Sequence, residues 1–219
     1  MAWRAGAIKK MGLIESYNNT TGHEFVSLSN GKLVIKAQDG DSGATERVNA
    51  LGKTVFEKRF SGLSGILTNV GIILKKPYGE DTDEEAITLS IEDGDTTYII
   101  QEFLNTRRGK EIVNKLLTTT DPISRPFEIK GYDFVGKEGK KITGYNYFLN
   151  GVKIGNYATK DVPNGMPLMS LVKVKGKDVW DDTDQVAFFK VKIKEWIKAL
   201  FGDDSQAVED NDESKDLPF

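Results

Sequence analysis

The sequence predicts a mainly β protein with one helix inside the chain and one helix near its end. Short strand-like runs recur from Lys32 onward, separated by Gly, Asn and Asp. Only two segments, about Arg107–Leu117 and Asp184–Gly202, place apolar residues at helical spacing. No internal repeat and no long linker interrupts the chain before residue 203. Many short strands with two helices fit a Greek-key barrel or sandwich in a single domain.

The first half of the chain is expected to form strands after an irregular N-terminal region. The expected strands are Lys32–Ala37, Lys53–Phe60, Gly65–Lys76, 87–91 and 96–103. In the run ITLSI, Ile87, Leu89 and Ile91 alternate with polar residues, as they do in a half-buried strand. The next residues, EDGD, are expected to turn the chain into the following strand, TTYIIQEF.

The middle of the chain is expected to form a helix and then a long hairpin. In the helix, Ile112, Leu116 and Leu117 have core-facing spacing. The hairpin covers FEIKGYDFVGKEGKKITGYNYFL, and its tip is GKEGK. The runs GVKIGNYA and SLVKVKG continue the strand pattern.

The last element, DQVAFFKVKIKEWIKALFG, carries two patterns at once. Phe189, Val191 and Ile193 alternate with lysines, as in a strand. The whole segment also has a helical apolar stripe, and its length favours a helix. Asp182 or Thr183 can cap its start, and Gly202 can end it. We therefore expect a closing helix.

Composition excludes several classes of site. The chain has 219 residues, a net charge of −3, no cysteine and one histidine, His23. Disulfides, thiolate catalysis and cysteine-bound zinc are therefore excluded, and a histidine-built metal site or triad is not expected. No segment has the pattern of a signal peptide or the length to span a bilayer. We expect a soluble, cytoplasmic protein.

Charge divides the chain at Gly202. Residues 203–219 contain seven acids and one base, Lys215, which gives −6. The preceding residues contain 29 bases and 26 acids, which gives +3, because the whole chain has 30 and 33. A segment this acidic and this poor in apolar residues is expected to be disordered. We therefore predict a domain over 1–202 and an acidic, partner-binding tail over 203–219. A tail that serves only solubility would not account for the final Leu-Pro-Phe.

No motif points to catalysis. VGKEGKKIT has only two residues between Gly136 and the Gly139-Lys140 pair, whereas a phosphate-binding loop needs four and a following helix. The acidic runs at 181–184 and Glu80–Glu85 lack the spacing of a calcium loop. We expect no enzymatic activity, no cofactor and no bound metal.

A basic and aromatic segment is the strongest functional signal in the body. Residues Phe127–Lys160 contain six lysines, three acids and seven of the 21 aromatic residues. Rings flanked by lysines suit single-stranded nucleic acid, since bases stack on the rings and ammonium groups neutralise phosphates. The predicted stacking residues are Tyr132, Phe134, Tyr145 and Tyr147, and the predicted phosphate contacts are Lys130, Lys137, Lys140, Lys141 and Lys153. Lys58, Arg59, Arg107 and Arg108 are predicted to widen the path. The alternative is that the rings belong to ordinary core packing.

The end of the chain resembles a known protein tip. Asp216-Leu217-Pro218-Phe219 follows an acidic run and resembles the Asp-(Asp)-Ile-Pro-Phe end of bacterial single-stranded DNA-binding proteins. A mixed β body that leads directly into such a tail resembles the bacteriophage type of these proteins, which have oligonucleotide/oligosaccharide-binding (OB) folds. The resemblance is residue-specific only at the tip, and the cysteines of one zinc-binding phage variety are missing.

The resemblance implies a function for both parts of the chain. The body would coat single-stranded DNA during phage or bacterial replication, recombination or repair, in the bacterial cytoplasm. The tail would compete with DNA for the basic surface, and its freed tip would bind a polymerase, helicase, primase, nuclease or recombinase. Three other readings remain open: an adaptor that binds only proteins, a magnesium-dependent nuclease, and an RNA-binding protein. A homo-oligomer is also possible.

Overall fold

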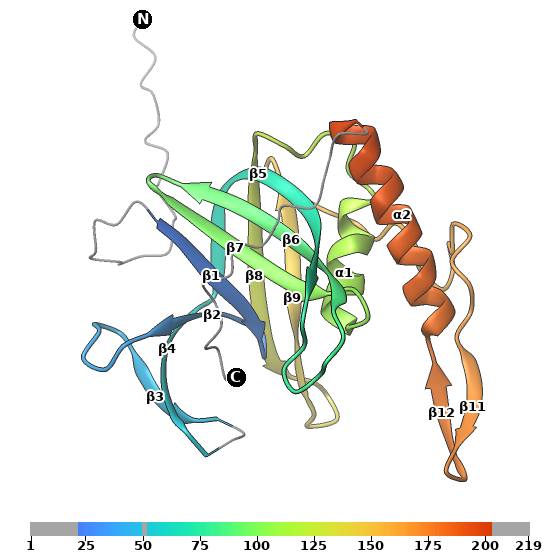
Figure 1. Cartoon of the computed structure of the whole chain (residues 1–219), viewed down its shortest axis with the longest axis horizontal. Helices are drawn as coiled ribbons and strands as arrows, with labels where there is room; N and C mark the ends of the chain where they lie inside the picture. Colours follow the sequence, from blue (N-terminus) through green and yellow to red (C-terminus); the bar gives the residue numbers. More distant parts are fainter. Residues whose placement is uncertain (1–21, 50–51, 203–219) are drawn as a thin grey trace, which may run out of the picture.

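The computed structural model describes residues 22–49 and 52–202 (Figure 1). Its strands are β1 Gly22–Ser29, β2 Lys32–Ala37, β3 Thr45–Val48, β4 Thr54–Phe60, β5 Gly62–Lys75, β6 Glu84–Asp93, β7 Thr96–Phe103, β8 Arg125–Val135, β9 Lys141–Leu149, β10 Val152–Lys153, β11 Ser170–Val174 and β12 Lys177–Asp181. The helices are α1 Arg107–Leu116 and α2 Thr183–Phe201. The prediction of a mainly β protein with two helices is confirmed.

Ten of the strands form one mixed sheet in the order β10-β9-β8-β5-β6-β7-β1-β2-β4-β3. Its only parallel pair among the described residues joins β1 to β7. Strands β5, β6 and β7 are consecutive neighbours, and β8 returns to lie beside β5. A fourth strand that returns to the first of three is the Greek-key arrangement, and here α1 lies within the long connection.

Strand β5 links two parts of the sheet. Its first residues, Gly62–Leu67, pair with β8, and residues from Ile66 onward pair with β6. The register with β6 shifts between Leu67 and Asn69, which marks a bulge. A Cβ added to Gly65 would lie 2.3 Å from the backbone oxygen of Glu92. Glycine at this position therefore allows β5 to pass closely over β6.

The sheet curls until the β1–β2 turn meets β8. A Cβ on Gly31 would lie 2.1 Å from the Tyr132 carbonyl oxygen, and one on Gly131 would lie 2.1 Å from the Gly31 oxygen. The Tyr145 hydroxyl also donates a hydrogen bond of 3.0 Å to the carbonyl of Lys32. Backbone packing and this bond join the two regions, and no ladder closes the described strands into a ring. The more specific expectation of an OB barrel therefore stays a prediction.

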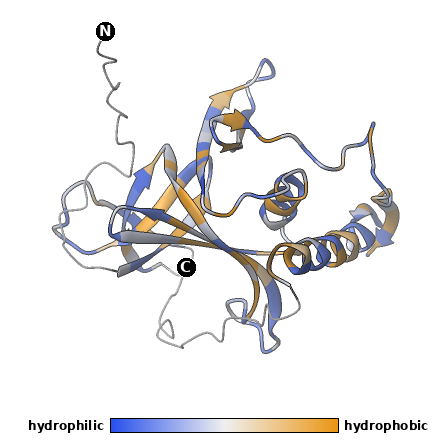
Figure 2. Ribbon diagram, turned by 90° about the horizontal axis from the view of Figure 1, so that it is seen from above, coloured by the Kyte–Doolittle hydropathy of each residue, from blue (hydrophilic) through white to orange (hydrophobic). Residues whose placement is uncertain are grey.

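Both helices pack on the same side of the curled sheet (Figure 2). Ile112, Val113 and Leu116 of α1 are buried in the main core, together with Phe189, Ile193 and Ile197 of α2. The Thr106 hydroxyl caps α1 by accepting from the Gly109 N–H at 3.0 Å. Helix α2 begins at Thr183 and stops before Gly202, as the sequence predicts, but Asp182 precedes it without forming a side-chain capping hydrogen bond. No helix in the described ranges is both long and apolar enough to cross a membrane.

Two expectations for local structure were wrong. The segment 22–29 was expected to be irregular, but it forms β1 between β2 and β7. The strand expected over GVKIGNYA is only the short β10. Beyond it the chain turns toward α1, where the Tyr157 N–H donates to the Asn114 carbonyl and the Ala158 N–H donates to the Asn114 side chain. These bonds replace those that a longer strand would make.

Candidate nucleic-acid interface

The β8–β9 hairpin has one buried face and one exposed face. Phe127 and Ile129 of β8 are 2% and 0% exposed, so the residues that alternate with them, from Glu128 to Phe134, point away from the core. Across the ladder, Tyr132 is opposite Gly144 and Phe134 is opposite Ile142. We call this exposed surface the hairpin outer face. It comprises Glu128, Lys130, Tyr132, Phe134, Ile142, Gly144, Asn146 and Phe148.

Two rings form a short ladder on the hairpin outer face. The centroids of Tyr132 and Phe134 lie 5.9 Å apart, with 32° between the ring planes. Phe134 is 54% exposed. A Cβ on Gly144 would lie 2.6 Å from Cζ of Tyr132, so the tyrosine ring lies directly over this glycine. The glycine thus provides the space in which the Tyr132 ring lies across β9.

A third ring, Phe148, belongs to the same face. Lys130 Nζ lies 5.0 Å from the Phe148 centroid, which is within range of a cation–π interaction. Phe148 is opposite Glu128 on one side and Lys153 of β10 on the other. The sequence analysis counted Phe148 among the aromatic residues but did not select it as a site residue. Its even spacing from Gly144 and Asn146, which alternate with the buried Tyr145 and Tyr147, could have identified it.

The lysines of this region are exposed and partly ion-paired. Lys130 lies 2.9 Å from Glu128, Lys140 lies 3.1 Å from Glu138, and Lys141 lies 3.4 Å from Asp133. Lys137 and Lys153 are also exposed. Lys153 is opposite Phe148 and so shares the hairpin outer face, whereas Lys141 follows the alternation of Tyr145 and starts on the opposite face of β9. Exposed ion pairs contribute only about 0–1 kcal/mol, so a phosphate can replace the carboxylate partner at little cost.

Tyr145 and Tyr147 do not belong to the interface. They are 5% and 1% exposed, and both lie in the main core. Tyr147 packs against Phe127 with a centroid distance of 6.4 Å. The prediction that these two tyrosines stack on bases is therefore corrected, because no base can reach rings that the sheet covers. Tyr145 and Tyr147 are core residues, which is the alternative stated in the sequence analysis. The prediction that rings of this hairpin stack on bases remains only for Tyr132 and Phe134.

The second basic stretch has structural partners. Glu57 of β4 is 5% exposed and accepts from both Arg47 and Arg59. Burial raises the pKa of Glu57, but the two guanidinium groups outweigh burial and hold the pKa below its usual value. Lys58 lies 3.9 Å from Asp41. The structure places Lys58 and Arg59 on β4, which has no ladder with β8 or β9.

Arg107 and Arg108 lie in the first turn of α1 and not on the hairpin outer face. Arg107 is exposed, whereas Arg108 is partly buried. Burial raises the pKa of Glu102 to about 7, and Arg108 opposes this shift. Burial likewise raises the pKa of Glu111 on α1. Arg108 therefore compensates buried carboxyl groups near the core, and it is a poor candidate for a phosphate contact.

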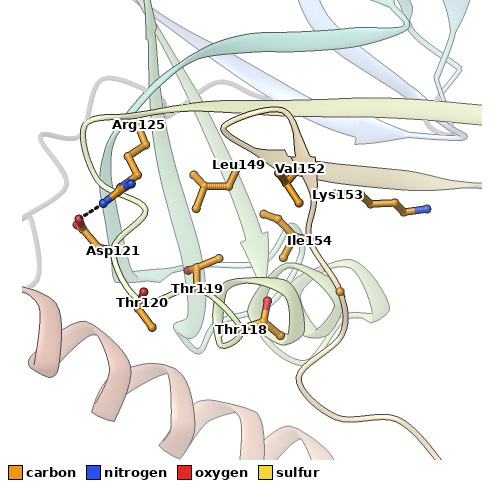
Figure 3. A pocket seen from close by; sticks show the side chains of 10 residues that line it. Thr118, Thr119, Thr120, Asp121, Arg125, Leu149, Val152, Lys153 and Ile154 are labelled. Carbon is orange, nitrogen blue, oxygen red and sulfur yellow. Dashed lines mark hydrogen bonds and ion pairs between the residues drawn. The ribbon is translucent and has the colours of Figure 1, made fainter.

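A shallow pocket lies between the α1–β8 connection and the β9–β10 turn (Figure 3). Its lining residues are Thr118, Thr119, Thr120, Asp121, Arg125, Leu149, Val152, Lys153, Ile154 and Gly155. Arg125 is held by Asp121 at 2.6 Å, and the Lys153 side chain points away from the pocket. The pocket thus contributes no further unpaired charge to the interface.

The predicted tip residues, Asp216, Leu217, Pro218 and Phe219, lie outside the described residues. Within 22–49 and 52–202, no three His, Cys, Asp or Glu side chains are grouped to hold a metal ion. Comparison with protein-family models, curated proteins and solved structures finds no match. The chemistry of the hairpin outer face is therefore the basis for assigning a function.

Proposed function

We propose that this protein binds and coats single-stranded DNA through the hairpin outer face. The observation that carries the proposal is the row of Lys130, Tyr132 and Phe134 on β8, with Phe148 beside it on β9. The row offers the exposed Phe134 ring and the half-buried Tyr132 and Phe148 rings to bases, and an ammonium group to phosphates. Stacking of this kind contributes about 1–3 kcal/mol per base and depends little on base identity.

The shape of this surface favours a single strand over a duplex. Its rings lie on a sheet, where only unpaired bases can reach them. Reading a duplex usually requires a basic helix that enters the major groove. On α2, the most lysine-rich helix, Lys190 and Lys194 are bound to Glu85. A helix with these internal partners is a weak candidate for groove recognition.

The strand order supports the more specific proposal of an OB fold. An OB fold is a partly open Greek-key barrel. The order β8-β5-β6-β7, the helix between β7 and β8, and the bulge in β5 are in keeping with it. In this proposal the β1–β2 hairpin supplies extra strands, which pair beside β7.

The acidic tail gives the protein a second role in this proposal. With a charge of −6, it can occupy the basic surface when DNA is absent. DNA displaces it, and the Leu-Pro-Phe end then binds replication, recombination or repair proteins of a phage or bacterial system. The apolar ring of Phe219, close to Asp216 and the acidic run before it, suits an apolar pocket with a basic rim.

A titration of the full-length protein with fluorescent oligo-dT tests the main proposal. Binding should weaken as salt rises, and duplex DNA of the same length should compete poorly. The same titration with oligo-U measures any preference for DNA over RNA. Failure to bind oligo-dT at low salt would refute the proposal and favour a protein-binding adaptor. Metal-dependent cleavage of the oligonucleotide would point to a nuclease.

A further inference from the structure

The β11–β12 hairpin projects from the molecule beyond the start of α2 (Figure 1). It is a separate two-stranded sheet, and neither outer edge pairs with another strand in the described part of the chain. An isolated two-stranded hairpin is only marginally stable in water, and three or four strands with an apolar face are more stable. The hairpin therefore has, among the described strands, two unpaired edges to which a further strand could be added.

Both faces of this hairpin carry exposed apolar side chains. On one face, Trp180 is opposite Leu171, and the two residues are 64% and 55% exposed. On the other face, Val179 is opposite Val172, and Val179 is 44% exposed. Large apolar groups gathered at such a projection indicate an interaction surface.

The sequence of β12 is complementary to itself when it runs antiparallel. If Val179 pairs with Val179 of a second copy, Lys177 is opposite Asp181 of that copy, and Asp181 is opposite its Lys177. Opposite charges at directly facing positions stabilise a strand pair. From this pattern we infer that β12 joins β12 of a second copy of this chain, so that the two hairpins form one four-stranded sheet.

This pairing gathers the exposed apolar groups of both hairpins. The two Val179 side chains meet at the two-fold axis on one face. On the other face, Trp180 is opposite Asp178 of the second copy and diagonal to its Trp180. Diagonal neighbours lie about 7–8 Å apart at Cα, which large aromatic side chains can bridge.

The two charged residues can take these partners. Within 22–49 and 52–202, Lys177 forms no ion pair at up to 4.0 Å. Asp181 uses Oδ1 to accept from the Thr183 N–H and hydroxyl, at 3.0 and 2.6 Å. Its Oδ2 remains the natural acceptor for the ammonium group of a second copy.

The other strand of the hairpin is less suited to self-pairing. Centred on Val172, β11 would place Ser170 opposite Val174 and Leu171 opposite Lys173. This arrangement forms no pair of opposite charges. The β12 edge is therefore the favoured contact. Five residues per copy make a small interface, of the kind found in weak and transient complexes.

A single introduced cysteine tests the inference directly, because the chain has none of its own. In Val179→Cys, the two introduced thiols face each other across the two-fold axis, at a strand spacing that a disulfide can bridge. The matched control is Val174→Cys on β11, which is 50% exposed but lies away from the axis. Val179→Cys should form disulfide-linked dimers at least roughly tenfold faster than the control. Equal rates of disulfide formation in the two variants would overturn the inference. A slower Val179→Cys reaction in the presence of oligo-dT would also overturn it, because DNA would then occupy the β12 edge.

Charge exchange gives an independent test by sedimentation velocity over a range of protein concentrations. Lys177→Asp and Asp181→Lys should each abolish the dimer alone, because each places like charges opposite each other. An equimolar mixture of the two variants should restore a dimer, because opposite charges then meet at both positions. The mixture also controls for the loss of the Asp181–Thr183 bonds. A mixture that stays monomeric where the wild type dimerises would refute this register. Both charge-exchange measurements are made without DNA, so their outcome does not depend on DNA binding.

Discussion

Replacing Phe134 by alanine tests the interface at its most exposed ring. The side chain is 54% exposed and touches the Tyr132 ring, so it can stack on a base without rearrangement. Loss of one stacking partner, at about 1–3 kcal/mol, predicts binding of oligo-dT that is about 5- to 150-fold weaker. Because half of the ring is already in water, the cost in folding free energy should be about 1–2 kcal/mol, below that of a buried phenylalanine. Fluorescence anisotropy measures the binding, and thermal unfolding measures the stability.

A matched control separates stacking from the loss of any exposed ring. Tyr78 is 65% exposed and lies in the β5–β6 connection, outside the hairpin outer face. Tyr78→Ala should leave the dissociation constant for oligo-dT within twofold, roughly the scatter expected for a surface change. Equal dissociation constants for Phe134→Ala, Tyr78→Ala and the wild type would refute the assignment of the hairpin outer face.

Four further outcomes are expected. Changing Lys140 and Lys141 together to alanine should reduce the log–log salt slope of oligo-dT binding by about 1.4, and an unchanged slope would remove both from the interface. Burial raises the pKa of Glu102 in the folded protein to about 7 from an ordinary 4.5. Between these pH values the folded protein binds more protons than the unfolded chain, so the free energy of unfolding falls as pH rises through this range. Glu102→Gln should therefore raise the free energy of unfolding at pH 8 by about 1–3 kcal/mol and flatten its dependence on pH, as measured by urea unfolding; the same pH dependence in both proteins would contradict this. Tyr147→Phe removes a buried hydroxyl that has no hydrogen-bond partner among the described residues, so it should stabilise the fold by about 1 kcal/mol, and a loss of stability would show that the hydroxyl is bonded. Deleting Leu217–Phe219 should leave oligo-dT affinity equal or higher while abolishing partner recruitment in pull-down assays, whereas much weaker DNA binding would rule out competition by the tail.

Much of the local structure could be predicted from the sequence, because it depends on neighbouring residues. Helix α1 begins at Arg107 as expected, and α2 ends before Gly202. The turn residues Gly94 and Gly139 lie between the strands of two predicted hairpins and have positive φ. Apolar spacing and turn residues determine structure over only a few neighbouring residues, so helix ends and hairpin turns can be predicted from one sequence alone.

The orientation of the long hairpin was only partly predicted. Alternation shows that Tyr132 shares a face with Phe134 and that Tyr145 shares a face with Tyr147, but it does not state which face is buried. The intervening residues contain that information. Lys130 has the same spacing as Tyr132 and Phe134, and these side chains face outward. Tyr145 and Tyr147 alternate with Gly144 and Asn146, which take the less buried positions on this part of β9.

Contacts between distant segments could not be predicted. The parallel pairing of β1 with β7 joins residues far apart in the chain, and no local pattern in GHEFVSLS identifies its partner. The close contact between Gly31 and Gly131 could not be predicted either, because each glycine could also belong to an ordinary turn or bulge. Burial of Arg108 beside carboxyl groups depends on the same long-range packing.

The parallel pair also constrains how the molecule forms during translation. Gly22 pairs with Thr96, so β1 cannot take its final place until the ribosome has released β7. Until then, β1 in the β1–β2 hairpin has one edge whose backbone hydrogen-bonding groups are unpaired, and such an edge can pair with strands of other chains and cause aggregation. Slow, long-range closure of this kind predicts that chaperones, or a pause in translation once β7 has left the ribosome, would improve the yield of native protein.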